Sequence, residues 1–119
     1  MILDHVQIAA PPDSENQARR FYGELLRLEE VAKPEPMRGS GGVWFAVGEQ
    51  QLHIGIEEPF SPARKAHPGL RVEPLELDAI AARLVDAGAR VDWDDRYPGV
   101  RRFYTADPFG NRIEILGGD

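Results

Sequence analysis

The stretch DPFGNRIEIL, Asp107–Leu116, combines a turn with the strand that follows it. Proline presets its own φ, and Gly110 and Asn111 tolerate positive φ, so DPFGN predicts a tight turn. The flanking patterns predict a hairpin between strands at 100–106 and 112–116. Glu114 is then a carboxylate set among apolar residues in the last strand.

An earlier stretch, QLHIGIEE at 51–58, has the same design, because His53 alternates with Leu52, Ile54 and Ile56. His53 and Glu114 are 61 positions apart, and two further pairs of landmarks have nearly the same spacing. His5 lies 62 positions before His67, and Val31 lies 60 before Val91. Three landmarks at one spacing predict two modules of similar length.

Hydrophobic periodicity assigns the same elements to each half. The first half is expected to hold a strand at 1–10, a helix at 16–28, a strand at 28–32 and a hairpin of 42–47 with 50–57. A loop over 33–42 precedes that hairpin, which turns at Gly48-Glu49. The second half is expected to hold strands at 66–72, 89–93, 100–106 and 112–116, with a helix at 77–87. The prediction is an α+β fold of two tandem βαβββ modules, 1–58 and 64–119, in a single domain, 1–119. Their strands would form a curved mixed sheet around a cavity, with the helices outside.

Composition narrows the classes of function. The 119 residues carry 14 Lys and Arg against 20 Asp and Glu, for a net charge of −6, which disfavours binding to nucleic acid. The absence of cysteine removes disulfides, thiolate nucleophiles and zinc–thiolate sites. Neither a membrane span nor a signal peptide is expected, so a cytoplasmic protein is predicted.

Four polar residues interrupt the apolar strands at equivalent places in the two halves: His5, His53, His67 and Glu114. A single histidine on a strand is more often a half-exposed or hydrogen-bonded ring than a metal ligand. Here, however, every histidine of the chain falls at a repeat position on the face opposite the aliphatic residues. Three imidazoles and one carboxylate suit a divalent first-row metal ion with coordination positions left for substrate.

Four segments resemble the vicinal oxygen chelate superfamily, which includes glyoxalase I, bleomycin-resistance proteins, fosfomycin-resistance enzymes and extradiol dioxygenases. The resemblance covers the whole chain and is carried by LDHVQIA, ARRFYGELLRLEEV, HPGLRV and DPFGNRIEIL. The DPFGN turn followed by a strand with Glu114 is the most characteristic of these segments.

The resemblance implies a ligand set of His5, His53, His67 and Glu114 for one divalent ion: Zn, Ni, Mn or Fe. His53 departs from the glyoxalase I pattern, which usually has glutamate or glutamine there, although imidazole remains a good ligand. The implied function is a glyoxalase-like, metal-dependent enzyme, a lyase, isomerase or transferase, acting on a small oxygenated molecule. The ion would stabilise an enolate or oxyanion, Glu114 or His53 would move a proton, and a homodimer is expected.

Other residues share strand parity with these ligands or lie near them in sequence. Candidates for contact with substrate are Gln7, Gln51, Arg71, Arg102, Trp44 and Phe103. The alternative function is a metal-free, bleomycin-resistance-like protein that binds and sequesters a small molecule. Sequestering relatives have commonly lost the ligands and lined the cavity with aromatic residues. This chain keeps all four polar positions and is 8% aromatic, which favours the enzyme.

Overall fold

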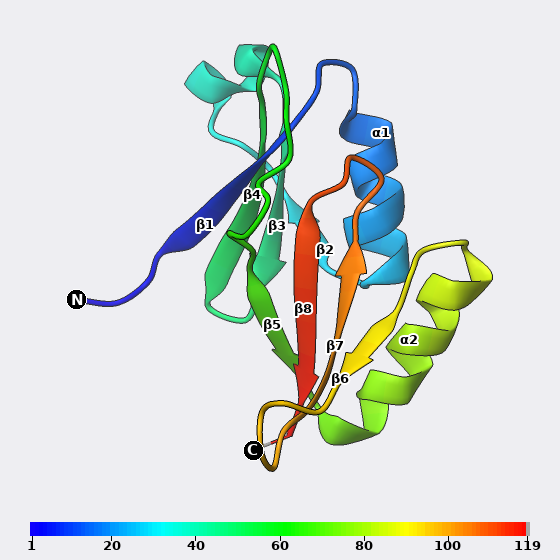
Figure 1. The fold of residues 1–119 in the computed structure, drawn as a ribbon. Helices are drawn as coiled ribbons and strands as arrows, with labels where there is room; N and C mark the ends of the chain where they lie inside the picture. Colours follow the sequence, from blue (N-terminus) through cyan, green and yellow to red (C-terminus); the bar gives the residue numbers. More distant parts are fainter. Residues whose placement is uncertain (119) are drawn as a thin grey trace. The chain divides into compact units, whose positions relative to one another are not determined.

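The computed structural model describes residues 1–118 and contains two compact units, Met1–Pro62 and Ala63–Asp119 (Figure 1). We call them module 1 and module 2. The boundary between them falls within a segment, 57–68, that contains no helix or strand. Each module contains one four-stranded mixed sheet, and the predicted pair of βαβββ modules is confirmed.

Module 1 has its strands in the order β1-β4-β3-β2, with β1 parallel to β4 and the other neighbours antiparallel. Its elements are β1 (His5–Ala10), α1 (Glu15–Ala18), η1 (Arg19–Leu25), β2 (Glu29–Val31), η2 (Glu35–Ser40), β3 (Val43–Val47) and β4 (Gln50–Ile56). The predicted hairpin is present, and Gly48 has a φ of 58° in its turn.

Module 2 repeats this plan with the order β5-β8-β7-β6, and β5 is parallel to β8. Its elements are β5 (Gly69–Val72), η3 (Pro74–Glu76), α2 (Leu77–Asp86), β6 (Asp92–Asp94), β7 (Arg101–Ala106) and β8 (Arg112–Gly117). The predicted turn before β8 is present, because the Asp107 carboxylate accepts the backbone N–H groups of Phe109 (3.0 Å) and Asn111 (2.8 Å).

The helix predicted at 16–28 is an α-helical turn followed by a wider, π-helical segment, η1. Leu26 N–H donates to the carbonyl of Phe21, five residues back, at 3.0 Å. Phe21 and Tyr22 are both buried (2% and 0% exposed), although a regular helix would separate neighbouring side chains by 100°. The wider turn therefore accompanies the burial of two consecutive aromatic rings.

Three further boundaries differ from the prediction. The expected loop at 33–42 contains the 3-10 helix η2, with Pro36 in its first turn, where the missing N–H of proline costs no helical hydrogen bond. The strand expected at 89–93 is β6 at 92–94, where Trp93 pairs with Phe103. The strand expected at 66–72 begins only at Gly69, so His67 precedes β5 rather than belonging to it.

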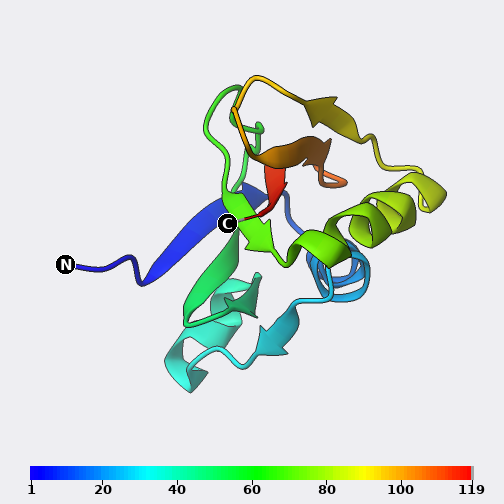
Figure 2. The same ribbon diagram turned by 90° about the horizontal axis from the view of Figure 1, so that it is seen from below.

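One face of each sheet packs against the helical segment of the same module (Figures 1 and 2). In module 1 the rings of Tyr22 and Phe45 are 5.7 Å apart. In module 2, Leu77 and Leu84 of α2 are fully buried, and Gly117 leaves room for Leu77. The helices thus cover the apolar faces, and the polar residues lie on the other faces. No helix within residues 1–118 combines the length and apolar character needed to span a membrane.

Candidate functional site

Strand register places the predicted residues of module 1 on one face of its sheet. His53 pairs with Gln7 of β1 and with Trp44 of β3, and His5 pairs with Gln51. Side chains of paired residues point to the same side, and residues two apart on one strand also share a face. All five residues therefore lie on the face opposite the helix-covered one.

The aromatic rings on this face form a stack of three. The His53 ring lies against the Trp44 indole, with ring centroids 3.8 Å apart and an interplanar angle of 2°. The His5 ring stacks at 4.3 Å from the His53 ring. Burial, followed by the charges of His5 and Lys33, holds the pKa of His53 below its ordinary value of 6.5, although Asp4 acts in the opposite direction. His53 is therefore neutral near pH 7 and can offer a nitrogen lone pair.

Hydrogen bonds fix the orientation of both imidazoles. His53 Nε2 is 2.8 Å from Gln51 Oε1, and His5 Nδ1 is 2.8 Å from Asp4 Oδ2. An oxygen acceptor at one nitrogen of each ring leaves His53 Nδ1 and His5 Nε2 as the nitrogens that can face a ligand. Gly55 lets Gln7 approach the strand, because a Cβ there would lie 2.8 Å from the Gln7 amide. The predicted Gln7 and Gln51 thus surround the two histidines.

In module 2 the structure brings His67 and Glu114 into direct contact. His67 Nε2 lies 2.9 Å from Glu114 Oε1, and His67 Nδ1 donates to the Lys65 carbonyl oxygen at 2.8 Å. The Glu114 N–H donates to the Pro68 carbonyl oxygen at 3.0 Å, which holds the segment before β5 against β8. Tyr104, paired with Glu114, contacts the His67 ring edge-on at 5.5 Å.

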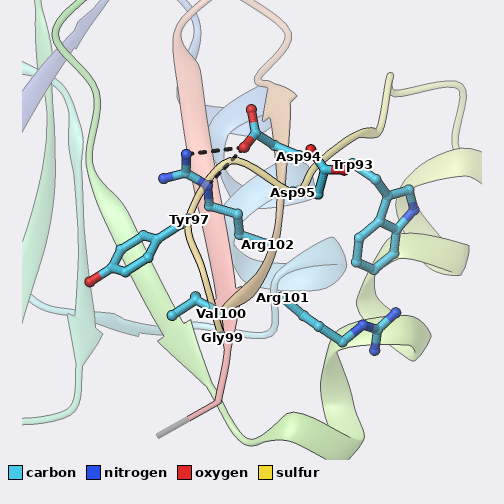
Figure 3. A pocket seen from close by; sticks show the side chains of 8 residues that line it. All are labelled: Trp93, Asp94, Asp95, Tyr97, Gly99, Val100, Arg101 and Arg102. Atoms are coloured by element: carbon cyan, nitrogen blue, oxygen red, sulfur yellow. Dashed lines mark hydrogen bonds and ion pairs between the residues drawn. The ribbon is translucent and has the colours of Figure 1, made fainter.

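Glu114 is also held by Arg102, which in turn contacts Asp94; Figure 3 shows the contact between Arg102 and Asp94. Arg102 Nη1 donates to Glu114 Oε2 at 3.0 Å, and its Nη2 donates to Asp94 Oδ1 at 3.1 Å. Burial alone would raise the pKa of Glu114, but the hydrogen bonds from His67 and Arg102 outweigh it and lower that pKa. Hydrogen bonds from Arg96, and then from Arg102, likewise lower the pKa of Asp94. Both carboxylates are therefore ionised at neutral pH.

A hollow of about 630 Å³ lies beside this network, around β6 and the loop that follows it. Figure 3 shows Arg102 and Asp94 directed toward each other, with Trp93 and Arg101 directed away from them. Arg102 also stands over the ring of Tyr97, at 5.4 Å from its centroid. The sequence interpretation missed Asp94 and Tyr97. For Asp94 the sequence held a signal, because Asp92 and Asp94 alternate with Trp93 and so share the polar face of a strand. The sequence held no comparable signal for Tyr97.

Two predicted contact residues lie away from these groups. Phe103 is fully buried on the helix-covered face, where it pairs with Ile115 and contacts Trp93 at 5.2 Å, so it belongs to the core of module 2. Arg71 is exposed, and its Nη1 donates to the Gly118 carbonyl oxygen at 2.8 Å. Trp44, Gln7, Gln51 and Arg102 remain as the candidates beside the histidines and Glu114.

Each module therefore contributes one pair of the four predicted ligands. His5 and His53 form the pair of module 1, and His67 and Glu114 that of module 2. Neither module, over residues 1–118, gathers three His, Cys, Asp or Glu side chains into a metal-binding cluster by itself.

A family model described as a glyoxalase-like domain matches residues 7–116. The chain belongs to this glyoxalase-like family, within the vicinal oxygen chelate superfamily. A crystal structure of a protein assigned to the glyoxalase family from Bacillus anthracis is 45% identical, with a TM-score of 0.93 over 100% of this chain and 96% of that one.

More distant structures share the fold. The fosfomycin resistance protein FosX from Listeria monocytogenes is 19% identical, with a TM-score of 0.79, over 100% of this chain and 96% of that one. Lactoylglutathione lyase from Agrobacterium tumefaciens is 22% identical, with a TM-score of 0.71, over 99% of this chain and 93% of that one. No curated protein sequence matches the chain.

Proposed function

We propose that this protein is a metal-dependent enzyme that acts on a small oxygenated molecule, with His5, His53, His67 and Glu114 binding one divalent ion. The observation that carries the proposal is the pair of His67 and Glu114, whose facing atoms are 2.9 Å apart. The ion would be Zn, Ni, Mn or Fe, all of which accept imidazole and carboxylate ligands.

The hydrogen bonding of His67 fits a metal ligand. Because the Lys65 carbonyl can only accept, His67 Nδ1 carries a proton, and Nε2 is the nitrogen left to face Glu114. His67 Nε2 and Glu114 Oε1 lie 2.9 Å apart, and either a proton on Nε2 or a divalent ion can join them. A backbone carbonyl on the far nitrogen is a common support for metal-ligating histidines.

The pair in module 1 satisfies the same requirement. His5 and His53 each have one ring nitrogen on an oxygen acceptor and one acceptor nitrogen left. Among residues 1–118, no hydrogen bond reaches His5 Nε2 or His53 Nδ1. In the proposal the two pairs serve one ion, either from the two modules of one chain or from two chains of a homodimer.

Glu114 and His53 are the proposed proton carriers. Bound at these ligands, a divalent ion would supply Lewis-acid stabilisation to an enolate or oxyanion of the substrate. Glu114 is ionised, and because Arg102 holds Oε2, Oε1 would be the oxygen that accepts a proton when it is not a ligand of the ion. His53 is neutral and buried beside Gln51, so its free nitrogen can accept a proton away from bulk water. Trp44 would form an apolar wall for the substrate.

The alternative function, a metal-free protein that binds and sequesters a small molecule, has one observation in its favour. Arg102 already supplies a positive charge to Glu114 at 3.0 Å, so the carboxylate does not require a metal to balance its charge. In that case Arg102 and Trp44 would contact the ligand directly. A homodimer and a location in the cytoplasm belong to the proposal in either form.

Metal retention tests the proposal. Protein purified without a histidine tag is stripped with EDTA, loaded separately with Zn, Ni, Mn and Fe(II), dialysed and measured by inorganic mass spectrometry. The proposal predicts about one retained ion per chain with at least one metal, and loss of that ion in His67→Ala. Retention of no ion under any loading would contradict it and would favour the metal-free binder.

A further inference from the structure

Module 1 contains a second recess, where the chain leaves β2 and returns to β3. Its volume is about 280 Å³, and its walls include Arg19, Glu30, Lys33, Arg38 and Trp44. Three of these five residues are cations, in a chain whose net charge is −6. The recess is therefore a local concentration of positive charge.

Only one of the three cations is neutralised by a carboxylate in the wall. Arg19 forms a bidentate ion pair with Glu30, in which Nε donates to Oε1 at 2.9 Å and Nη2 donates to Oε2 at 3.2 Å. Lys33 and Arg38 form no ion pair with any of residues 1–118. Lys33 Nζ instead donates to the Gly41 carbonyl and to Ser40 Oγ, and Arg38 Nε donates to the Lys33 carbonyl at 2.9 Å. The terminal nitrogens of Arg38 and one N–H of Lys33 remain for a ligand.

Glu15 is a further carboxylate near Lys33. It accepts the Gly42 N–H at 2.9 Å, and its charge interacts with those of both Arg19 and Lys33. Glu15 does not line the recess. The lining itself has three cations and one carboxylate, Glu30, so the wall of the recess carries a net positive charge.

The recess shares a wall with the candidate metal-binding face. The indole of Trp44 lines the recess and stacks on the His53 ring at 3.8 Å. The charge of Lys33 also contributes to lowering the pKa of His53. The recess and the His53 ring thus share Trp44 as a common neighbour.

We propose that this recess binds an oxyanion group of the substrate, a carboxylate or a phosphate, held by Lys33 and Arg38. The substrate would then be a small anionic molecule whose reacting oxygens reach His53 while its charged end lies beyond Trp44. This inference rests on the proposed function for its substrate, but anion binding by the recess itself needs no metal. Charge-assisted hydrogen bonds from lysine and arginine are well suited to either group.

The test is an NMR titration of the 15N-labelled, EDTA-treated protein with sodium phosphate and, separately, with sodium acetate. Sodium chloride at equal ionic strength provides the baseline. We expect saturable shifts of the backbone amides of 33–42 and of the Trp44 indole N–H with at least one of the two anions. The anion that binds more tightly identifies the preferred head group.

Variants locate the binding groups. Lys33→Met and Arg38→Met should each weaken binding roughly tenfold or more, since each removes a charge-assisted contact. Arg64→Met removes the same charge from module 2 and should leave the affinity unchanged. Because Arg38 is exposed, its variant keeps the test valid if Lys33→Met disturbs the loop.

Shifts no larger than with chloride, or equal affinity in Arg38→Met and the parent protein, would overturn the inference. Metal retention, measured on the same variants, separates the two proposals. Anion binding without metal retention would leave the recess as an anion site and reject the metal-dependent function. Metal retention without anion binding would support the metal-dependent function and reject the anion site.

Discussion

The two modules use one backbone plan for two different kinds of chemistry. In both, the polar pair lies at the parallel strand pair, on the face away from the helix, with an aromatic residue of the neighbouring strand beside it. Module 1 places stacked rings there, with a neutral His53 between Trp44 and His5. Module 2 places charged groups there, with Glu114 between His67 and Arg102. The repeat thus determines where a side chain is presented, while the residue type determines its protonation and partners.

The largest expected effect on stability comes from substitutions in the buried core of each module rather than in its pair of predicted ligands. Phe45 of module 1 and Phe103 of module 2 are fully buried on the helix-covered faces. Truncation of either to alanine should lower the free energy of unfolding by about 3–5 kcal/mol, because it removes buried apolar surface and leaves a cavity. Urea denaturation measures this loss. Leu75→Ala, at a side chain that is 96% exposed, should cost less than about 0.5 kcal/mol. Similar losses at Phe45 and Leu75 would show that the face is not a packed core.

The next largest effect is a pH dependence of stability in the metal-free protein, which differs between the two modules. The folded-state pKa of His53 is lowered from 6.5, so its contribution to stability is present above pH 6.5 and is lost as the pH falls through the folded-state value. The pKa of Glu114 is lowered from 4.5, so its contribution is present above pH 4.5 and is lost below that in the same way.

Two variants check these windows by urea denaturation at a series of pH values. His53→Gln should remove the fall in stability that begins near pH 6.5 and keep the one that begins near pH 4.5. Glu114→Gln should keep the fall that begins near pH 6.5 and remove the one that begins near pH 4.5. If the two variants had identical pH profiles, the assignment of one titrating group to each module would be wrong.

The smallest effect compares two adjacent arginines of β7. The Arg102 side chain is 14% exposed and joins two carboxylates that are 12% and 10% exposed. The Arg101 side chain is 60% exposed and pairs with an exposed Asp78. Arg102→Gln should therefore lower the urea midpoint more than Arg101→Gln, since exposed ion pairs contribute little. An equal or smaller effect at Arg102 would mean that the Glu114–Arg102–Asp94 network does not stabilise module 2.

Most of the fold could be predicted because its signals are local. Alternation around His53 and Glu114 and the turns at Gly48 and DPFGN each depend on a few neighbouring residues. The segment η1 could not be predicted, because the wider turn depends on where Phe21 and Tyr22 both pack. The start of β6 likewise depends on pairing with Phe103 across the sheet.

The candidate site was only partly predictable, for the same reason. The repeat identified His5, His53, His67 and Glu114, and the structure joins them in two pairs. The prediction that Phe103 contacts substrate is wrong, because Phe103 lies on the helix-covered face. The register of β7 with β8 decides this, since Tyr104 and not Phe103 pairs with Glu114. Lys33 and Arg38 had no repeat partner and no periodic pattern, so only the folded loop reveals that they line one recess.

The central claim is that the pairs of both modules bind the same ion. The most direct test is native mass spectrometry of the metal-loaded protein, with His5→Ala from module 1 and His67→Ala from module 2 as the two variants. We expect one ion per chain in the parent protein, and loss of that ion in either variant alone. Full retention of the ion in one of the two variants, or two ions per chain that are lost independently, would contradict it.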